Sequence, residues 1–189
     1  MCGINGIFAR HDAAASIDFT ELSLTRDAMI SRGPDAGDFW VSENSRVGFG
    51  HRRLAIIDVS DAANQPMVSA DGKLVIVFNG EIYNYRELRT ELQSKGCVFR
   101  TQSDTEVLLH LYAQDGAAML SALRGMFAFA IYNQERDDLF LARDPFGIKP
   151  LYIADEGGTL RFASQVKALL AGGKVSGQIN PAGDRKSVV

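Results

Sequence analysis

The fold class can be read from residues 125–163, GMFAFAIYNQERDDLFLARDPFGIKPLYIADEGGTLRFA. This stretch contains short apolar runs, typical of strands, at 125–132, 138–142, 150–154 and 159–163. Only a few turn residues separate several of these runs, whereas a parallel crossover connection needs about a dozen residues or more. The segment therefore predicts antiparallel sheets.

Further runs and helical patterns outside this segment complete an α+β architecture. Additional strands are predicted at 3–9, 53–57 and 73–78, and helices at 19–31, 85–95, 103–114 and 165–170. Asn84 and Gly96 are expected to cap and stop the second helix, and Ser103 and Glu106 to form a capping box at the third. Because each antiparallel sheet must bury one face, the helices are expected to form layers against the sheets.

Length and composition restrict the class of protein. A chain of 189 residues fits a single domain, which we place at 2–175, and the breaker-rich segment 176–189 predicts a linker or tail. The formal net charge of -3 argues against general nucleic-acid binding. No apolar stretch approaches the ~20 residues of a membrane-spanning helix, and the N-terminus lacks a secretory-signal pattern. We therefore expect no membrane association and a cytoplasmic location.

The common cofactor motifs are absent from the sequence. It contains no G-x-x-x-x-G-K-[ST] phosphate loop, no G-x-G-x-x-G dinucleotide pattern, no SGG-type pyrophosphate loop and no paired-histidine zinc helix. Cys2 and Cys97 are the only cysteines, so they offer neither a disulfide framework nor paired-cysteine metal spacing. We therefore expect this chain to hold no metal and no cofactor, ATP included.

Cys2 is the first candidate for chemistry. Removal of Met1 would leave this residue with both a thiol and a free α-amino group. A model thiol titrates near ~8.5 and an α-amine near ~7.7 to 8.0, so proton exchange between them is nearly balanced and the amine can serve as the base. Taken alone, a cysteine at a frayed terminus is more often incidental.

A histidine is the alternative base. His51, in GHRRLAIID, could form a dyad with Cys2, and His11 and His110 are weaker candidates. A lone histidine beside arginines is more often structural, so the dyad remains the minority interpretation.

Other positions have side chains suited to acyl transfer on an amino acid. Asn79 and Gly80, in FNGEIYNY, could each donate an N–H group to an oxyanion, worth roughly 3 kcal/mol per donor. Asp104 lies in the first turn of a predicted helix, where free N–H groups keep a carboxylate ionised, and it could bind an ammonium group. Arg53 could grip an α-carboxylate through two parallel hydrogen bonds. Each of these residues also has a purely structural explanation, as a turn, a favourable helix start or an ion pair.

The combination of motifs is more informative than any one of them. Eight segments in this order resemble the glutamine amidotransferase domain of asparagine synthetases, over about residues 2–170: MCGINGIF, SRGPDAG, GHRRLAIID, FNGEIYNY, SDTEVLLHLY, GMFAFAIY, RDPFGIKPLY and FASQVKAL. The resemblance implies a class II amidotransferase with the αββα sandwich of N-terminal-nucleophile hydrolases, in which two stacked antiparallel sheets lie between helical layers.

The resemblance also implies a role for each candidate residue. Cys2 would attack the side-chain amide of glutamine while its own α-amine moves the proton, and water would hydrolyse the γ-glutamyl thioester after ammonia leaves. The oxyanion hole would be Asn79 and Gly80. Arg53 would bind the α-carboxylate, and Asp104 and Glu81 the α-amino end. The pocket lining would include Leu54, Ala55, Ile56 and Ile57, and the ammonia tunnel would start at Arg32, Met126 and Ile148.

Partners follow from the same resemblance. L-glutamine is the expected substrate, and the tail is expected to lead to a C-terminal synthetase domain that would hold ATP and Mg. A homodimer stays open. Asparagine is the expected product, with two alternatives: another ammonia acceptor, or a non-catalytic glutamine-binding module in which Met1 is retained.

Overall fold

A computed structural model describes residues 1–11, 14 and 16–178. Most of the predicted tail, residues 179–189, lies outside the described residues. The helices are α1 (Phe19–Asp27), α2 (Tyr85–Ser94), α3 (Asp104–Asp115) and α4 (Val166–Ala171). The strands are β1 (Gly3–Ala9), β2 (Ala36–Val41), β3 (Val47–Arg53), β4 (Met67–Val68), β5 (Leu74–Ile82), β6 (Gly125–Asn133), β7 (Asp138–Arg143), β8 (Tyr152–Glu156) and β9 (Thr159–Ala163).

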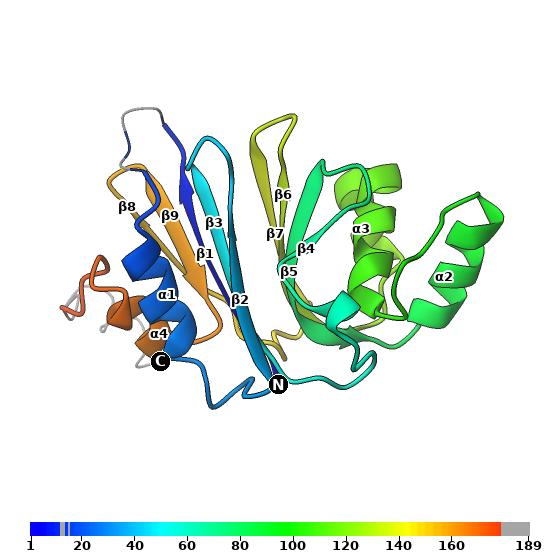
Figure 1. The fold of residues 1–189 in the computed structure, drawn as a ribbon, viewed down its shortest axis with the longest axis horizontal. Helices are drawn as coiled ribbons and strands as arrows, with labels where there is room; N and C mark the ends of the chain where they lie inside the picture. Colours follow the sequence, from blue (N-terminus) through cyan, green and yellow to red (C-terminus); the bar gives the residue numbers. More distant parts are fainter. Residues whose placement is uncertain (12–13, 15, 179–189) are drawn as a thin grey trace, which may run out of the picture.

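The strands form two sheets, and all their neighbouring strands are antiparallel. The five-stranded sheet has the order β2-β3-β1-β9-β8, and the four-stranded sheet has the order β4-β5-β6-β7. Helices α1 and α4 cover the outer face of the first sheet, α3 covers the outer face of the second, and α2 packs outside α3 (Figure 1). The predicted α+β class and its αββα layers are confirmed.

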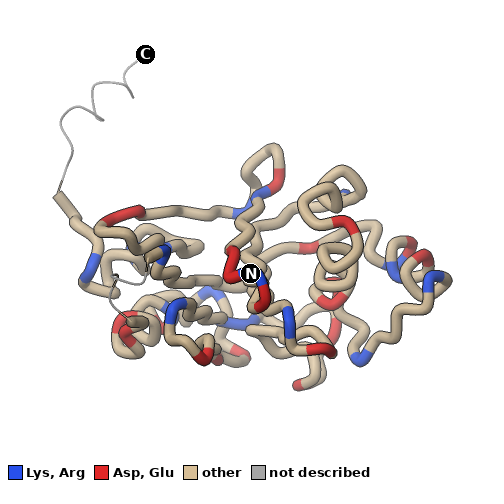
Figure 2. The backbone as a smooth tube through the Cα atoms, turned by 90° about the horizontal axis from the view of Figure 1, so that it is seen from above, with Lys and Arg blue, Asp and Glu red and all other residues tan. Residues whose placement is uncertain are grey.

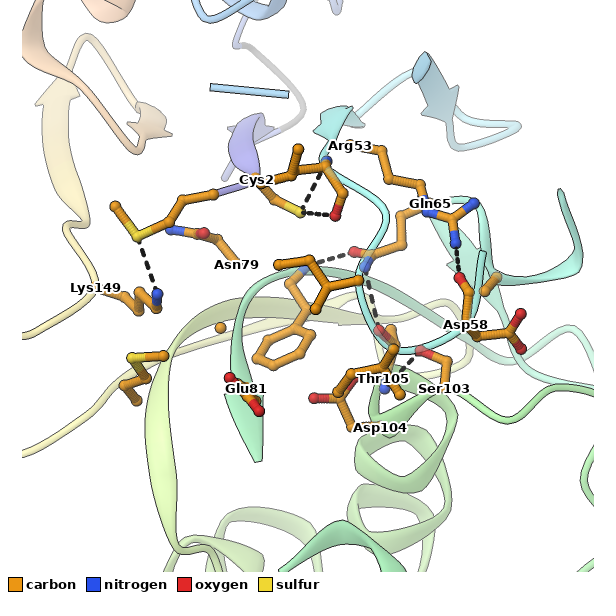
Figure 3. Close-up of a pocket in the computed structure, with 18 residues that line it drawn as sticks. Cys2, Arg53, Asp58, Gln65, Asn79, Glu81, Ser103, Asp104, Thr105 and Lys149 are labelled. Carbon is orange, nitrogen blue, oxygen red and sulfur yellow. Dashed lines mark hydrogen bonds between the residues drawn. The ribbon is translucent and has the colours of Figure 1, made fainter. Parts of the chain in front are cut away.

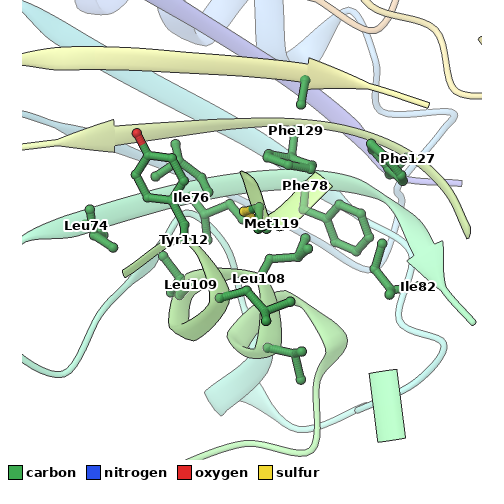
Figure 4. Packing of buried hydrophobic residues seen from close by; sticks show 14 of the residues in the cluster. Leu74, Ile76, Phe78, Ile82, Leu108, Leu109, Tyr112, Met119, Phe127 and Phe129 are labelled. Atoms are coloured by element: carbon green, nitrogen blue, oxygen red, sulfur yellow. The ribbon is translucent and has the colours of Figure 1, made fainter. Parts of the chain in front are cut away.

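Strand β5 shows how the sequence divides its side chains between two cores. Val75 and Val77 point into the cluster between the sheets, whereas Ile76, Phe78 and Ile82 point toward α3. This alternation follows from the two-residue period of a strand. The outer cluster brings Ile76 and Phe78 against Leu108, Tyr112 and Met119, all of them buried (Figure 4). The sequence of β5 therefore fixes which of its residues face the gap between the sheets.

The charged residues are spread over the molecule, and the N-terminus lies near its centre. Lys, Arg, Asp and Glu are spread over both halves of the molecule, and the N-terminus lies between the halves (Figure 2). Within the described ranges, no helix combines the length and the apolar character needed to cross a membrane.

Several predicted boundaries were wrong. The strand predicted at 53–57 is instead the end of β3 followed by a loop. Strands β2 and β4 and most of β3 were not predicted from the sequence. Strand β5 continues to Ile82, and the helix predicted at 19–31 ends at Asp27. These boundaries depend on pairing between distant segments, which a local pattern does not contain.

Two predicted helix caps also differ in detail. The capping box at α3 does not form, because the Glu106 carboxylate accepts from the backbone N–H groups of Arg100 and Thr101. The N–H of Ser103 donates instead to the Thr101 hydroxyl at 3.1 Å. Asn84 precedes α2 as predicted, but its amide bonds Ala122 and Arg124 rather than the helix.

Candidate active site

Cys2 lies just before β1, at the end of the gap between the two sheets. Its Sγ accepts a hydrogen bond from the Leu54 N–H at 3.4 Å and lies 3.6 Å from the Leu54 carbonyl oxygen (Figure 3). Arg32 Nε donates to the Cys2 carbonyl oxygen at 2.9 Å. Burial raises the pKa of the Cys2 thiol, and the Leu54 N–H acts in the opposite direction because it stabilises the thiolate. The sulfur is thus held in place by the residue that follows β3, and Cys2 lines a pocket.

The outer edge of β5 supplies the opposite wall of this pocket. Phe127 of β6 exchanges its hydrogen bonds with Asp144, so its partner Gly80 directs its N–H away from β6. Phe78 and Ile82, two residues to either side, direct theirs the same way, to Gln65 Oε1 and Asp104 Oδ2. Strand β4 covers this edge only at 75–76. The Gly80 N–H is therefore left without a partner among the described residues.

Asn79 provides a second donor beside it. Its side chain is 1% exposed, and its Nδ2 atom is buried with no hydrogen-bond partner within the described part of the chain. An unpaired buried amide group costs roughly 1–3 kcal/mol, so such a group needs an explanation. A backbone N–H and an amide N–H on the wall facing a thiol are the elements of an oxyanion hole.

Arg53 is the last residue of β3 and reaches across to the following loop. Its Nη1 donates to the Ser60 carbonyl at 2.8 Å and to Asn64 Oδ1 at 2.6 Å, and its Nη2 donates to the Asp58 carbonyl. A guanidinium has five N–H donors, so two remain after these three contacts to described residues. Arg53 is therefore a loop-holding residue in addition to the predicted carboxylate ligand.

Asp104 and Glu81 occupy the far end of the pocket from Cys2 (Figure 3). Asp104 lies in the first turn of α3 and accepts from the Ile82 N–H at 3.1 Å. Burial raises the pKa of Asp104 to about 6, and the backbone N–H groups at the start of α3 act in the opposite direction. At neutral pH this carboxylate is still mostly ionised, and a ligand ammonium group would compensate its desolvation.

Eight lining residues were not predicted as site residues: Met1, Asp58, Ala63, Gln65, Phe78, Ser103, Thr105 and Lys149. Gln65 links two walls, because its Oε1 accepts from the Phe78 N–H at 2.6 Å and its Nε2 donates to the Thr105 hydroxyl at 3.1 Å. No local pattern marks Gln65, which belongs to the loop between β3 and β4. Lys149 belongs to the motif RDPFGIKPLY, but nothing in that motif indicates that its side chain is buried.

Some of the predicted pocket and tunnel residues line the pocket of Cys2, and others do not. Leu54, Ile56, Ile57 and Met126 line the pocket. Ala55 does not, because it turns aside and donates its N–H to Asp35. Arg32 reaches the Cys2 carbonyl without lining the pocket, and Ile148 is 55% exposed outside it.

His51 lies apart from the Cys2 pocket. It lines a separate small cavity, and its Nε2 is 3.3 Å from the Phe78 carbonyl oxygen. Burial lowers the pKa of His51 to about 3, so the ring is neutral at physiological pH. This geometry favours the α-amine over the dyad. Among residues 1–178 as described, His, Cys, Asp and Glu form no group that could hold a metal ion.

Comparison with known proteins agrees with this arrangement. The family described as "Glutamine amidotransferase domain" matches residues 1–186. The chain belongs to this family, and it is therefore the amidotransferase domain of an enzyme.

Its relatives include glutamine-hydrolysing asparagine synthetases. The chain is 49% identical to asparagine synthetase [glutamine-hydrolyzing] 1 of Bacillus subtilis over 90% of this chain and 27% of that protein. It is 42% identical to asparagine synthetase B [glutamine-hydrolyzing] of Escherichia coli over 90% of this chain and 30% of that protein. The predicted resemblance is confirmed, and the chain spans less than a third of the length of these relatives.

A solved structure supports the fold independently. Glutamine phosphoribosylpyrophosphate amidotransferase from B. subtilis superposes with a TM-score of 0.72, at 24% identity, over 91% of this chain and 44% of that chain. At this identity the similarity establishes the fold alone.

Proposed function

We propose that this domain hydrolyses L-glutamine to glutamate and ammonia through a Cys2 γ-glutamyl thioester, after removal of Met1. The observation that carries the proposal is a pair of donors on the pocket wall opposite the Cys2 sulfur, Asn79 Nδ2 and the Gly80 N–H, neither of which has a partner among the described residues. The buried Asn79 donor costs folding free energy without a ligand, and both donors would be satisfied by an oxyanion.

The reaction divides into two acyl transfers. The Cys2 α-amine takes the thiol proton, Sγ bonds to the amide carbon of glutamine, and Asn79 and Gly80 hold the oxygen anion. The protonated α-amine then gives its proton to the amide nitrogen, the C–N bond breaks, and ammonia leaves. Water attacks the resulting thioester with the amine again as base, which releases glutamate and regenerates the thiol.

The ends of the pocket fit the α-substituents of glutamine. The two remaining N–H groups of Arg53 can bind the carboxylate, while Asp104 and Glu81 bind the ammonium group. With Asp104 and Glu81 at one end and Cys2 at the other, the pocket would select an amino acid whose amide lies at the end of its side chain.

The test uses protease-cleaved fusion proteins that begin either at Met1 or at Cys2, with both termini verified by intact mass. We expect glutamate release only from the form that begins at Cys2, and hydroxylamine should trap the thioester as γ-glutamyl hydroxamate. Cys2→Ala should abolish both signals, and Cys97→Ser is the matched control that keeps them. Equal release from Cys2→Ala and the unchanged chain would contradict the proposal.

The non-catalytic alternative is supported by one specific contact. Met1 lines the pocket, and its Sδ lies 3.0 Å from Lys149 Nζ. A chain that kept Met1 would have no free Cys2 amine and a partly filled pocket. Glutamine binding without turnover by the form that begins at Met1 is the result this alternative requires.

The use of the ammonia is a further proposal. The relatives extend well beyond this domain, so we propose that a C-terminal synthetase domain with ATP and Mg uses the ammonia to form asparagine from aspartate, in the cytoplasm. Production of asparagine from glutamine, aspartate and ATP by the full-length protein would test this. Another amidated product would identify a different acceptor and leave the glutaminase proposal intact.

A further inference from the structure

Lys149 is a buried cation that the proposed mechanism does not use. Its side chain lies in the wall of the Cys2 pocket, and the residue is only 4% exposed (Figure 3). No carboxylate of the described residues forms an ion pair with it. Within the described part of the chain, its Nζ has one hydrogen-bond contact, to the Met1 thioether, which is a weak and neutral acceptor. Removal of Met1 would take away even this contact.

Hydrogen bonds from neighbouring side chains fix the backbone around Lys149 and therefore its position in the pocket wall. Asp144 accepts from the N–H groups of Ile148 at 2.9 Å and Lys149 at 3.0 Å. Arg143 Nε donates to the Lys149 carbonyl oxygen at 2.7 Å, and Arg143 Nη2 donates to the Gly147 carbonyl at 2.5 Å. Two charged side chains therefore fix the loop that directs one ammonium group into the pocket.

We infer that Lys149 is an electrostatic positioning residue of the amidotransferase reaction, whose buried charge keeps the α-amino group of the processed Cys2 neutral and able to accept a proton. The inference rests on the proposed role of Cys2. A nearby positive charge disfavours a second one, and burial strengthens the effect because little water screens it. The same charge favours the Cys2 thiolate over the thiol.

Other charged groups face the same sulfur and amine, and their effects partly cancel. At the sulfur, Arg32 and Arg53 act in the same direction as Lys149, while the Asp104 carboxylate acts against it. The carboxylates of Glu81 and Asp144 act on Lys149 itself and favour its charged form. Burial lowers the pKa of Lys149 itself, and the guanidinium of Arg32 adds to this shift. Arg32 donates to the Cys2 carbonyl, and Arg53 donates to the loop at 58–64. The Lys149 ammonium donates to no backbone carbonyl or side-chain oxygen of the described residues. Lys149 can therefore be changed without breaking these contacts.

The test compares Lys149→Met with Lys149→Arg, which keeps the charge, and with Lys167→Met, a matched change of an exposed lysine on α4. All are made in a Cys97→Ser background with Met1 removed. For each, kcat/KM for glutamine hydrolysis is measured from pH 5 to 9. We expect Lys149→Met to move the acidic limb upward by about one pH unit, with roughly tenfold lower kcat/KM at pH 6. Lys149→Arg and Lys167→Met should both show the pH profile of the unchanged chain.

A second readout separates this inference from the proposed function. The rate of Cys2 alkylation by iodoacetamide is followed over the same pH range, since it reports the thiolate without requiring turnover. A parallel upward shift in Lys149→Met supports the inference even in protein that releases no glutamate. Profiles that coincide for Lys149→Met and the unchanged chain, or a loss that is uniform across pH in a folded variant, would overturn it.

Discussion

Replacing Asn79 by leucine should separate the catalytic from the structural value of one buried amide. The Asn79 Nδ2 atom has no partner among the described residues, so folding gains no hydrogen bond from it. Leucine has a similar size and no polar atom, and it removes a desolvation cost of roughly 1–3 kcal/mol. The free energy of unfolding should therefore stay the same or increase.

The same change should slow glutamine hydrolysis strongly. Loss of one oxyanion donor costs about 3 kcal/mol of transition-state stabilisation, and each 1.36 kcal/mol is a factor of ten in rate. We therefore expect kcat to fall about 150-fold. KM should change little, because the donor binds the transition state rather than the substrate.

The assay combines steady-state glutamate release with urea unfolding of the same preparations. The matched control is Asn84→Leu, since Asn84 lies outside the pocket and bonds the Ala122 carbonyl and the Arg124 N–H at 3.0 Å each. It should lose about 1 kcal/mol of stability and keep its kcat. An Asn79→Leu protein that unfolds more easily while retaining kcat would refute the assignment, because that is the behaviour of a structural amide.

Three further changes test other parts of the site. Burial raises the pKa of Asp104 to about 6, so the folded state binds its proton more tightly than the unfolded state, and stability falls as pH rises from about 4 to 6. In the ligand-free protein, Asp104→Asn should add up to roughly 3 kcal/mol to the free energy of unfolding at pH 8 and little at pH 4. Equal changes in the free energy of unfolding at both pH values would contradict this. The KM for glutamine should rise. Gly80→Ala would place a Cβ 2.4 Å from the Met126 carbonyl oxygen, so we expect a loss of about 1–3 kcal/mol in thermal unfolding, and an unchanged melting temperature would show that β5 and β6 lie further apart. His51→Gln should keep a donor near the Phe78 carbonyl and leave the acidic limb of the activity profile in place, whereas its loss would revive the histidine dyad.

The sequence predicted the elements that carry their own pattern. Strands β1 and β9 match their predicted bounds, and α2 and α3 match theirs to within a residue, because apolar period and end signals coincide there. Strands β2 and β3 were missed because glycines dilute the strand pattern. Gly50 shows why a glycine is needed in β3, since a Cβ at this position would lie 2.5 Å from the Asn5 side chain on the neighbouring strand. Such a close approach between strands cannot be inferred from either segment alone.

The candidate site was predicted residue by residue only where a family motif existed. Cys2, Asn79, Gly80, Arg53 and Asp104 do line one pocket, although they come from four separate elements and their flanking residues. Each of them, taken alone, also had a structural explanation, and only the motifs taken together favoured the functional one. Residues that act by connecting walls had no such mark. Gln65 is the example, because its role depends on β5 and α3 both being within reach.

The uncovered edge of β5 links the fold to the chemistry. An exposed strand edge is ordinarily a liability, because its free N–H and C=O groups can pair with another chain. Here β4 is only two residues long, so the edge from Phe78 to Ile82 is open to side chains. Gln65 and Asp104 take the two outer N–H groups and leave the Gly80 N–H between them. A longer β4 would stabilise the sheet and fill this donor, so the short strand is what leaves room for an oxyanion. It follows that a substitution which extends β4 pairing toward Gly80 should gain stability and lose glutamine hydrolysis together.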